Sequence, residues 1–218
     1  MNDAGRMEET LAKLAELLEG SGARWVVGGS TGLALRGAKL GRAPRDVDLY
    51  ADANDVRAIH ERLSEFALDA PAEDETDKYR SILSHYHIGG TVVELVGQFR
   101  VAARNSVYKT EVSEFLYPMG HEVRIAGKNV VLVPLAHELV FNLLRDRVDR
   151  VEMVGALITA DSRLHVTQLE KLLARNHISE EVTAAARTYA ARDERNGAKG
   201  AAIADEQDEN GNVSAGRD

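Results

Sequence analysis

WVVGGSTGLALRGAKLGRAPRDVDLY, residues 25–50, contains two short apolar runs, each joined to polar groups that suit phosphate chemistry. The first run ends in Gly28, Gly29 and Ser30, and a strand that ends in a glycine turn offers backbone N–H groups to phosphates. The second run contains Asp46 and Asp48, whose side chains share one face if the run is a strand. The stretch therefore predicts a phosphate-binding turn close to a pair of carboxylates.

The pair Asp46 and Asp48 is a candidate site for a hard divalent cation, which could in turn bind phosphate oxygens. We expect a third carboxylate from a neighbouring strand. Glu94 is the candidate because it lies among valines and leucines, where an unpaired charge is expensive to bury. Two interpretations stay open: Glu94 completes the site, or it faces solvent on an edge strand. The two aspartates could likewise be an ordinary solvated strand end.

The composition indicates a globular protein with a sizeable core. The chain has 218 residues, 44% of them hydrophobic, which allows one large domain or two small ones. No apolar run approaches the roughly 18 to 20 residues of a transmembrane helix, and the first residues do not resemble a signal peptide. The absence of cysteine excludes disulfides, thiolate zinc sites and cysteine nucleophiles. We therefore expect a cytoplasmic protein without a membrane partner.

The charge is uneven along the chain. A net charge of −8 argues against broad, non-specific binding of nucleic acid, which requires a basic face. Residues 36–45, RGAKLGRAPR, nevertheless hold four basic residues and no acidic one. A local basic loop in an acidic protein suits a small anion, such as a nucleotide, better than a long polyanion.

Hydrophobic periodicity predicts mixed strands and helices up to about residue 133 and helices alone after it. Expected helices cover residues 5–20, 30–35, 54–66, 148–160, 167–175 and 179–192, with another that starts near Pro134. Expected strands cover residues 23–27, 46–50, 79–88, 91–100, 121–126 and 129–133. Residues 69–78 are expected to form an acidic loop, and residues 101–120 are not assigned.

This order of elements predicts an α+β fold with α/β-like character. A small mixed sheet with flanking helices would form a catalytic domain over residues 1–133. A helical domain would follow over residues 134–192. Residues 193–218 lack a core-forming pattern and are expected to be a disordered tail.

Three motifs together resemble the nucleotidyltransferase superfamily of the DNA polymerase beta type. They are VGGS at residues 27–30, DVDL at residues 46–49, and Glu94 on a later strand. The long gap between the first two motifs is most similar to the antibiotic (aminoglycoside and lincosamide) nucleotidyltransferases. It also resembles the minimal nucleotidyltransferases of toxin–antitoxin and phage-defence systems. The resemblance covers about residues 24–98.

The resemblance implies a site with three kinds of residue. The carboxylates that bind Mg²⁺, two ions in all, and carry the catalysis would be Asp46, Asp48 and Glu94, with Glu94 holding the second ion or helping to deprotonate a hydroxyl. The residues that bind the nucleotide would be Gly28, Gly29, Ser30, Arg42 and Arg45. Relatives usually add a carboxylate from the helical part as a base, and Glu138, Asp146, Asp149 and Glu152 all remain candidates for it.

The resemblance implies transfer of a nucleoside monophosphate from a nucleoside triphosphate, the co-substrate, to a hydroxyl, with release of pyrophosphate. The acidic composition favours a small-molecule acceptor over RNA. One alternative is a toxin-like nucleotidyltransferase that modifies tRNA or protein. Another is a non-catalytic nucleotide-binding protein on the same scaffold. The acceptor, the preferred nucleotide and the oligomeric state, a homodimer included, stay open.

Overall fold

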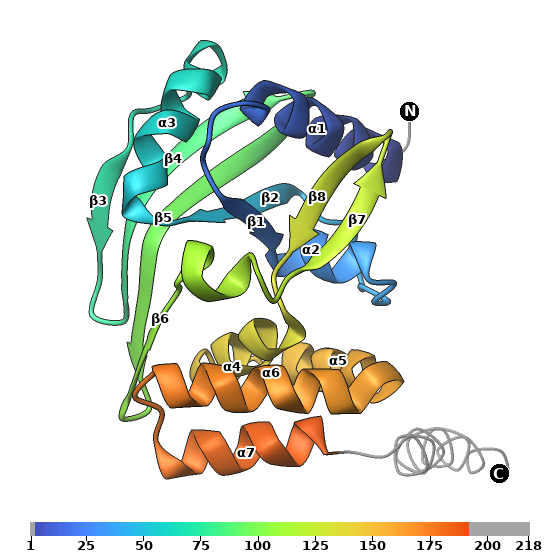
Figure 1. The fold of residues 1–218 in the computed structure, drawn as a ribbon, viewed down its shortest axis with the longest axis vertical. Coiled ribbons are helices and arrows are strands. Elements are labelled where there is room, and N and C mark those ends of the chain that lie inside the picture. The colour runs from blue at the N-terminus through green and yellow to red at the C-terminus, as the bar shows by residue number, and fades with distance from the viewer. Residues whose placement is uncertain (1–2, 192–218) are drawn as a thin grey trace, which may run out of the picture.

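The computed structural model describes residues 3–191, and it consists of one sheet between two groups of helices (Figure 1). Along the chain, the helices and strands follow one another as α1 (Asp3–Leu18), β1 (Trp25–Gly28), α2 (Gly29–Leu35), β2 (Asp46–Ala51), α3 (Ala53–Leu63), η1 (Ser64–Phe66), β3 (Ala72–Glu75), β4 (Tyr79–Ile88), β5 (Thr91–Ala103), β6 (Ser106–Lys109), η2 (Val112–Leu116), β7 (His121–Ile125), β8 (Lys128–Leu132), α4 (Leu135–Leu144), α5 (Val148–Ile158), η3 (Thr159–Asp161), α6 (Ser162–Arg175) and α7 (Glu180–Ala190).

The sheet is mixed. Its strands lie in the order β3-β4-β5-β2-β1-β8-β7, and β6 pairs with the far end of β5. Hairpins join β4 to β5 and β7 to β8 in antiparallel pairs, whereas β2 pairs in parallel with β5 and β1 with β8. A parallel pair needs a long crossover connection, and between β2 and β5 the chain passes through α3, β3 and β4.

Two hydrophobic clusters fix the helices to the sheet. One cluster places the apolar stripe of α1, Leu11, Leu14 and Leu18, and the inner side of α3 against the strands. The other joins the opposite face of the sheet to α4, α5, α6 and α7. In Figure 1 these four helices lie together below the sheet, whereas α1 and α3 lie above it. The position of the helical bundle against the sheet is therefore set by shared apolar packing.

The predicted fold class, a small mixed sheet with flanking helices followed by a helical part, is confirmed. The expected acidic loop at residues 69–78 is wrong in part, because Ala72–Glu75 forms strand β3 and pairs with β4. All four residues of β3 are exposed, so they carry no burial pattern from which a strand could be predicted. The predicted tail, residues 193–218, lies outside the described residues.

Helix α3 begins earlier than expected. Its N-cap is Asp52, whose carboxylate accepts hydrogen bonds from the backbone N–H groups of Val112 and Ser113, at 2.8 Å each. Asp52 therefore links α3 to η2 instead of capping its own helix. Among the described residues, no helix is both long and apolar enough to cross a membrane.

Gly97 lets α3 pack close to β5. A Cβ atom at this position would lie 2.3 Å from Cγ2 of Val56 on α3 and 3.3 Å from the carbonyl oxygen of Ile82 on β4. Neither neighbour can move far, because Val56 is buried and Ile82 contributes a backbone atom.

We expect Gly97→Ala to lower the free energy of unfolding by about 1–3 kcal/mol, the usual cost of overpacking a close contact. Urea denaturation followed by circular dichroism measures this loss. The matched control is Gly41→Ala, because a Cβ at Gly41 would meet no atom within 4 Å. Equal stability of the two variants would contradict the packing role of Gly97.

Candidate functional site

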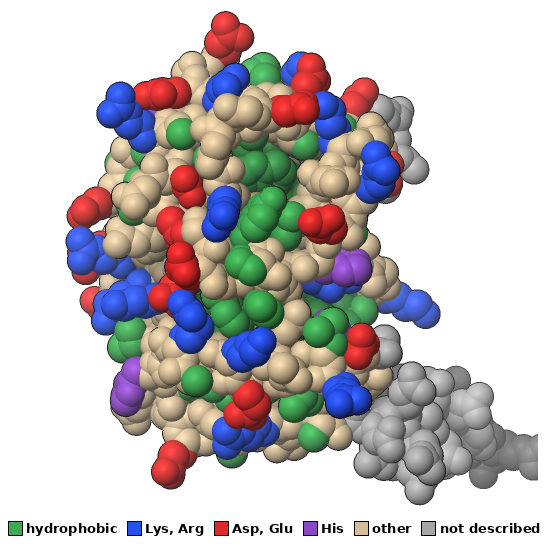
Figure 2. Space-filling view, viewed as in Figure 1, with side chains coloured by type: hydrophobic (Ala, Val, Ile, Leu, Met, Phe, Trp, Pro, Cys, Tyr) green, Lys and Arg blue, Asp and Glu red, His purple; other side chains and the backbone are tan. Residues whose placement is uncertain are grey.

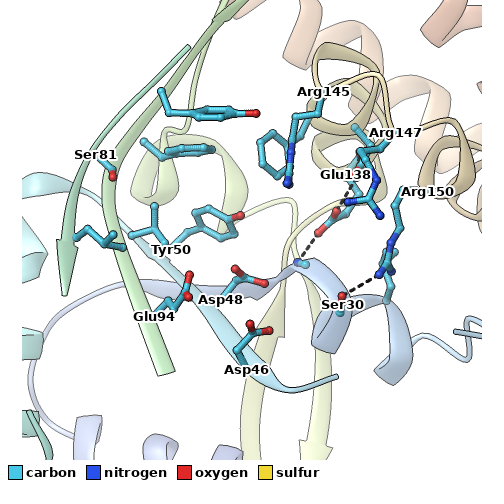
Figure 3. Close-up of a pocket in the computed structure, with 18 of the residues that line it drawn as sticks. Ser30, Asp46, Asp48, Tyr50, Ser81, Glu94, Glu138, Arg145, Arg147 and Arg150 are labelled. Carbon is cyan, nitrogen blue, oxygen red and sulfur yellow. Dashed lines mark hydrogen bonds between the residues drawn. The ribbon is translucent and has the colours of Figure 1, made fainter. Parts of the chain in front are cut away.

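Three carboxylates lie on one face of the sheet where β2 and β5 pair. Asp46 and Asp48 are two residues apart on β2, and Glu94 on β5 is the direct register partner of Asp48. In a parallel pair, register partners point to the same face. Figure 3 shows the three carboxylates directed into the same space. Of the two interpretations of Glu94, the structure therefore favours the one in which it joins the aspartates.

The glycine turn is shaped by Asp48. Gly29, the first residue of α2, has φ +61, and a Cβ there would lie 1.8 Å from Oδ2 of Asp48. Gly28 is the register partner of Asp48 on β1, and a Cβ there would lie 2.8 Å from the ring of Tyr50. Both glycines are thus required by close contacts, and the turn and the carboxylate occupy adjoining space.

The environment of this carboxylate cluster disfavours the ionised form of Asp48. Burial, followed by the repulsion of Asp46 and Glu94, raises the pKa of Asp48 from 3.8 to about 7. Arg145 and Arg150 act in the opposite direction but do not cancel the effect. A carboxylate that is disfavoured by its like-charged neighbours is a group that a cation would stabilise in the ionised form.

The donor set fits a hard divalent cation. Asp46, Asp48 and Glu94 supply only carboxylate oxygens, the ligand type that Mg²⁺ prefers. Among the described residues, however, no three His, Cys, Asp or Glu side chains already converge in the geometry of a metal site. The three residues share a face and a cavity, and ligation of one ion would require their side chains to turn toward it.

A cavity of about 380 Å³ separates the carboxylates from the helical bundle. Arg145, Arg147 and Arg150 line its opposite wall, and Figure 3 shows them directed from the helices toward the sheet. The Nη2 atom of Arg150 donates to Oγ of Ser30 at 3.0 Å, and its buried Nη1 atom has no hydrogen-bond partner. The cavity therefore has a negative wall on the sheet and a positive wall on the bundle.

The basic loop contributes less than expected. Arg42 lines the cavity, but Arg45 does not; it lines a separate hollow with Arg6, Met7 and Gly90. Sequence reasoning missed the three bundle arginines, which come from the end of α4 and the start of α5. The spacing RDRVDR at residues 145–150 was a signal, because it places three cations within one short connection.

Glu138 is the acid of the helical part that reaches the cavity. It is 2% exposed, and its Oε1 atom accepts a hydrogen bond of 2.7 Å from the backbone N–H of Gly29. The side-chain amide of Asn142 donates to its Oε2 atom at 3.2 Å. Burial raises the pKa of Glu138 to about 7 in spite of these two donors. The N–H of Gly29, expected to bind phosphate, is thus already bonded to a side chain.

The other three candidate acids are engaged elsewhere. Asp146 pairs with Arg104 at 2.9 Å, and Asp149 pairs with Arg147 at 3.0 Å. The hydroxyl of Tyr189 donates to Glu152 at 3.0 Å. None of these acids lines the cavity between sheet and bundle.

An aromatic cluster closes one end of the cavity. Tyr79 stacks on Phe99, with ring centroids 6.0 Å apart, and Phe99 meets Phe141 edge to face at 5.5 Å. Tyr50 contacts Phe99, and the guanidinium of Arg145 lies 4.8 Å from the ring centroid of Phe141. These rings offer flat apolar surface next to the charged walls, which suits a base or a sugar ring.

The raised pKa of Asp48 makes the stability of the metal-free protein depend on pH. Because the folded pKa lies above the unfolded value, the folded state holds the proton more tightly, and stability falls as pH rises from about 4 to about 7. Asp48→Asn removes this ionisation. We therefore expect the variant to be more stable than the wild type by about 1–3 kcal/mol at pH 8, with little difference at pH 4.

Chemical denaturation at both pH values, in the presence of a chelator, measures this effect. Asp149→Asn is the control, because Arg147 holds the pKa of Asp149 below its ordinary value and its removal should give no gain at pH 8. A difference between Asp48→Asn and the wild type that does not change with pH would contradict the assignment.

Three solved structures that resemble the chain are distant from it in sequence. A candidate nucleotidyltransferase from Thermotoga maritima is 24% identical, with a TM-score of 0.54, over 69% of this chain and 91% of its own. ANT(2'')-Ia in complex with adenylyl-2''-tobramycin is 16% identical, with a TM-score of 0.42, over 82% and 94% of the two chains. The lincosamide adenylyltransferase LnuA, bound to lincomycin, is 11% identical, with a TM-score of 0.43, over 68% and 96%.

Family assignment rests on the sequence match and not on these distant structures. No curated protein sequence matches the chain. The family model of aminoglycoside-2''-adenylyltransferase matches residues 10–131, which is more than half of the chain. The match runs from within α1 to within β8 and therefore includes the glycine turn and all three sheet carboxylates. The chain thus belongs to the aminoglycoside-2''-adenylyltransferase family and is a nucleotidyltransferase.

Proposed function

We propose that this enzyme transfers a nucleoside monophosphate from a nucleoside triphosphate to a hydroxyl group of a small-molecule acceptor, with Mg²⁺ as the cofactor. The observation that carries this proposal is the opposition of two walls across one cavity. Asp46, Asp48 and Glu94 lie on the sheet, and three arginines lie on the bundle. A triphosphate held by metal ions needs both kinds of group, carboxylates for the cations and guanidiniums for the phosphate oxygens.

Asp46 and Asp48 would hold the metal ions, with Glu94 completing the set. When bound, two such ions neutralise charge on the triphosphate and stabilise the attacking and leaving oxygens of an in-line displacement. The acceptor oxygen forms a bond to the α-phosphorus, and the bond from that phosphorus to the pyrophosphate oxygen breaks. The hydroxyl proton passes to a carboxylate, and Glu94 is the candidate because it is only partly buried and faces the cavity.

Arg150 is our candidate for the main phosphate-binding residue. Its Nη2 atom donates to Oγ of Ser30 in the glycine turn, and its buried Nη1 atom has no hydrogen-bond partner among the described residues. A buried donor without a partner is costly unless a ligand satisfies it. Arg42 and Ser30 would add contacts from the sheet side. Gly28 would shape the turn, and Arg45, which lies outside the cavity, would not contact the nucleotide.

Glu138 would position the glycine turn instead of acting on the acceptor. Its carboxylate is buried, and Gly29 and Asn142 already donate to its two oxygens. The residue ties α4 to the first residue of α2, so that the bundle and the turn keep one relative position. We propose that the boundary near residue 133 therefore separates two functional parts, one carrying the carboxylates and the other, residues 134–192, carrying the cations.

The acceptor would carry positive charge. The edge strand β3, residues AEDE, is fully exposed, and Asp74 from this strand lines the cavity. Its register partner on β4 is Ser81, which also lines the cavity, so Asp74 places an acidic side chain at the rim beside the aromatic cluster. An amino sugar, the acceptor class that the family name describes, has the hydroxyls and the ammonium groups that this rim would recognise.

Incubation of the protein with Mg²⁺, each nucleoside triphosphate and a panel of aminoglycosides, lincosamides and neutral sugars tests the proposal. We expect pyrophosphate release only when a hydroxylated acceptor is present, and an acceptor mass increased by one nucleoside monophosphate. Asp48→Asn should lose at least about 100-fold of this rate, because one metal ligand is gone. No release with any acceptor, or equal rates in the variant, would argue against it.

Arg150→Gln should raise the KM for the nucleoside triphosphate at least about tenfold, as expected for one lost hydrogen bond to a charged group. Arg45→Gln is the matched control, since this arginine lies outside the cavity, and its KM should stay within about twofold of the wild type. Steady-state kinetics of pyrophosphate release at a saturating acceptor concentration supplies both values. The reverse order of effects would contradict the placement of the triphosphate.

A further inference from the structure

A second hollow, of about 780 Å³, lies between the start of α3 and the strands β4, β5 and β6. Gly97 and Ile82 face Val56 of α3. Arg80 lies two residues before Ile82 on β4 and therefore points to the same face, so the hollow is on the α3 side of the sheet. Acidic and basic side chains gather at the left of Figure 2, over the region where Figure 1 places β3, β4 and β6.

Three cations form a row across this hollow. Arg80 on β4 is the register partner of Arg100 on β5, and Arg100 is the register partner of Lys109 on β6. All three residues line the hollow. Directly opposed residues on paired strands have Cβ atoms about 4.5–5.5 Å apart, and like charges in this arrangement are destabilising. Arg80 also faces its register partner Glu75 on β3 and pairs with Glu73, so the like charges of the row that lack a counter-charge are those of Arg100 and Lys109.

The acids that line the hollow are already engaged. Asp52 accepts the two backbone N–H groups of η2, and Glu111 pairs with Arg175 at 2.6 Å. Glu73 makes a long contact of 3.5 Å with Arg80.

That leaves two cations of the row. Within the described part of the chain, the side chains of Arg100 and Lys109 have no hydrogen-bond or ion-pair partner. Arg100 is partly buried and Lys109 is exposed, so both can be reached from solvent.

We propose that Arg80, Arg100 and Lys109 form a second anion-binding site, separate from the catalytic cavity, which binds the phosphate group of a small phosphorylated ligand. A guanidinium matches the geometry of phosphate oxygens, and an adjacent ammonium adds a point charge. The bound anion would relieve the repulsion within the row. The acids around the rim and the net charge of −8 disfavour a long polyanion such as RNA.

The new site touches the catalytic cavity but does not share its charged groups. Ser81 and Phe99 line both hollows, and the two hollows lie on opposite sides of the β4–β5 pair. The register between these strands shifts between Arg80 and Ile82, and Gln98 has φ 49 at this irregularity. The proposal depends on this row of cations alone and holds whatever acceptor the enzyme uses.

Isothermal titration calorimetry of the full chain with inorganic pyrophosphate, in the presence of a chelator, tests the site. Arg150→Gln is used as the background, because we expect it to weaken pyrophosphate binding in the catalytic cavity. On this background we expect Arg100→Gln with Lys109→Gln to weaken pyrophosphate binding at least tenfold. Lys171→Gln, an exposed cation on α6, serves as the matched control and should leave the affinity unchanged.

Thermal melting without pyrophosphate tests whether the substitutions themselves disturb the fold. The double substitution should leave the melting temperature unchanged or raise it, because it removes like charges. Pyrophosphate should raise the melting temperature of the Arg150→Gln protein but not of the triple variant. Affinity that stays within twofold in the triple variant would overturn the proposal. So would a short single-stranded RNA that binds this row more tightly than pyrophosphate, since the site would then serve nucleic acid.

Discussion

The parallel pairing of β2 with β5 holds Asp48 opposite Glu94, and the site depends on this register. Three carboxylates on one face repel one another, and the repulsion appears in the pKa of Asp48, which burial and its neighbours raise to about 7. A fold selected for stability alone would not favour such a cluster. The surrounding packing, with Val47 and Leu49 fully buried on the opposite face of β2, keeps the strand in place.

The helical bundle, α4–α7, carries cations opposite this negative face of the sheet. Two hydrogen bonds join the bundle to the glycine turn. Gly29 donates to Glu138 of α4, and Ser30 accepts from Arg150 of α5. Consecutive residues of one turn thus contact two helices of the bundle. The apolar cluster that joins the sheet to α4–α7 holds the walls at a fixed separation. The cavity between the two layers therefore results from packing on both sides of a glycine turn.

Much of this arrangement could be predicted from local pattern. The β4–β5 hairpin, the β7–β8 pair and the apolar stripe of α1 follow from periodicity and from glycine turns. Strand β3 could not be predicted, because its residues AEDE are all exposed and it exists only through pairing with β4. Arg150 was missed because local sequence does not indicate a contact between residues distant in the chain, and its partner Ser30 lies 120 residues away.

By itself, the sequence determined the turn and the aspartate pair. Glycine is required where a backbone with positive φ meets a carboxylate, as at Gly29, and the two-residue period of a strand places Asp46 and Asp48 on one face. The tertiary structure alone decided that Glu94 joins them and that Glu138 reaches the cavity while Asp149 does not. The positions of these side chains depend on strand register and on helix docking. Both are set by contacts between residues distant in the chain and not by local preference.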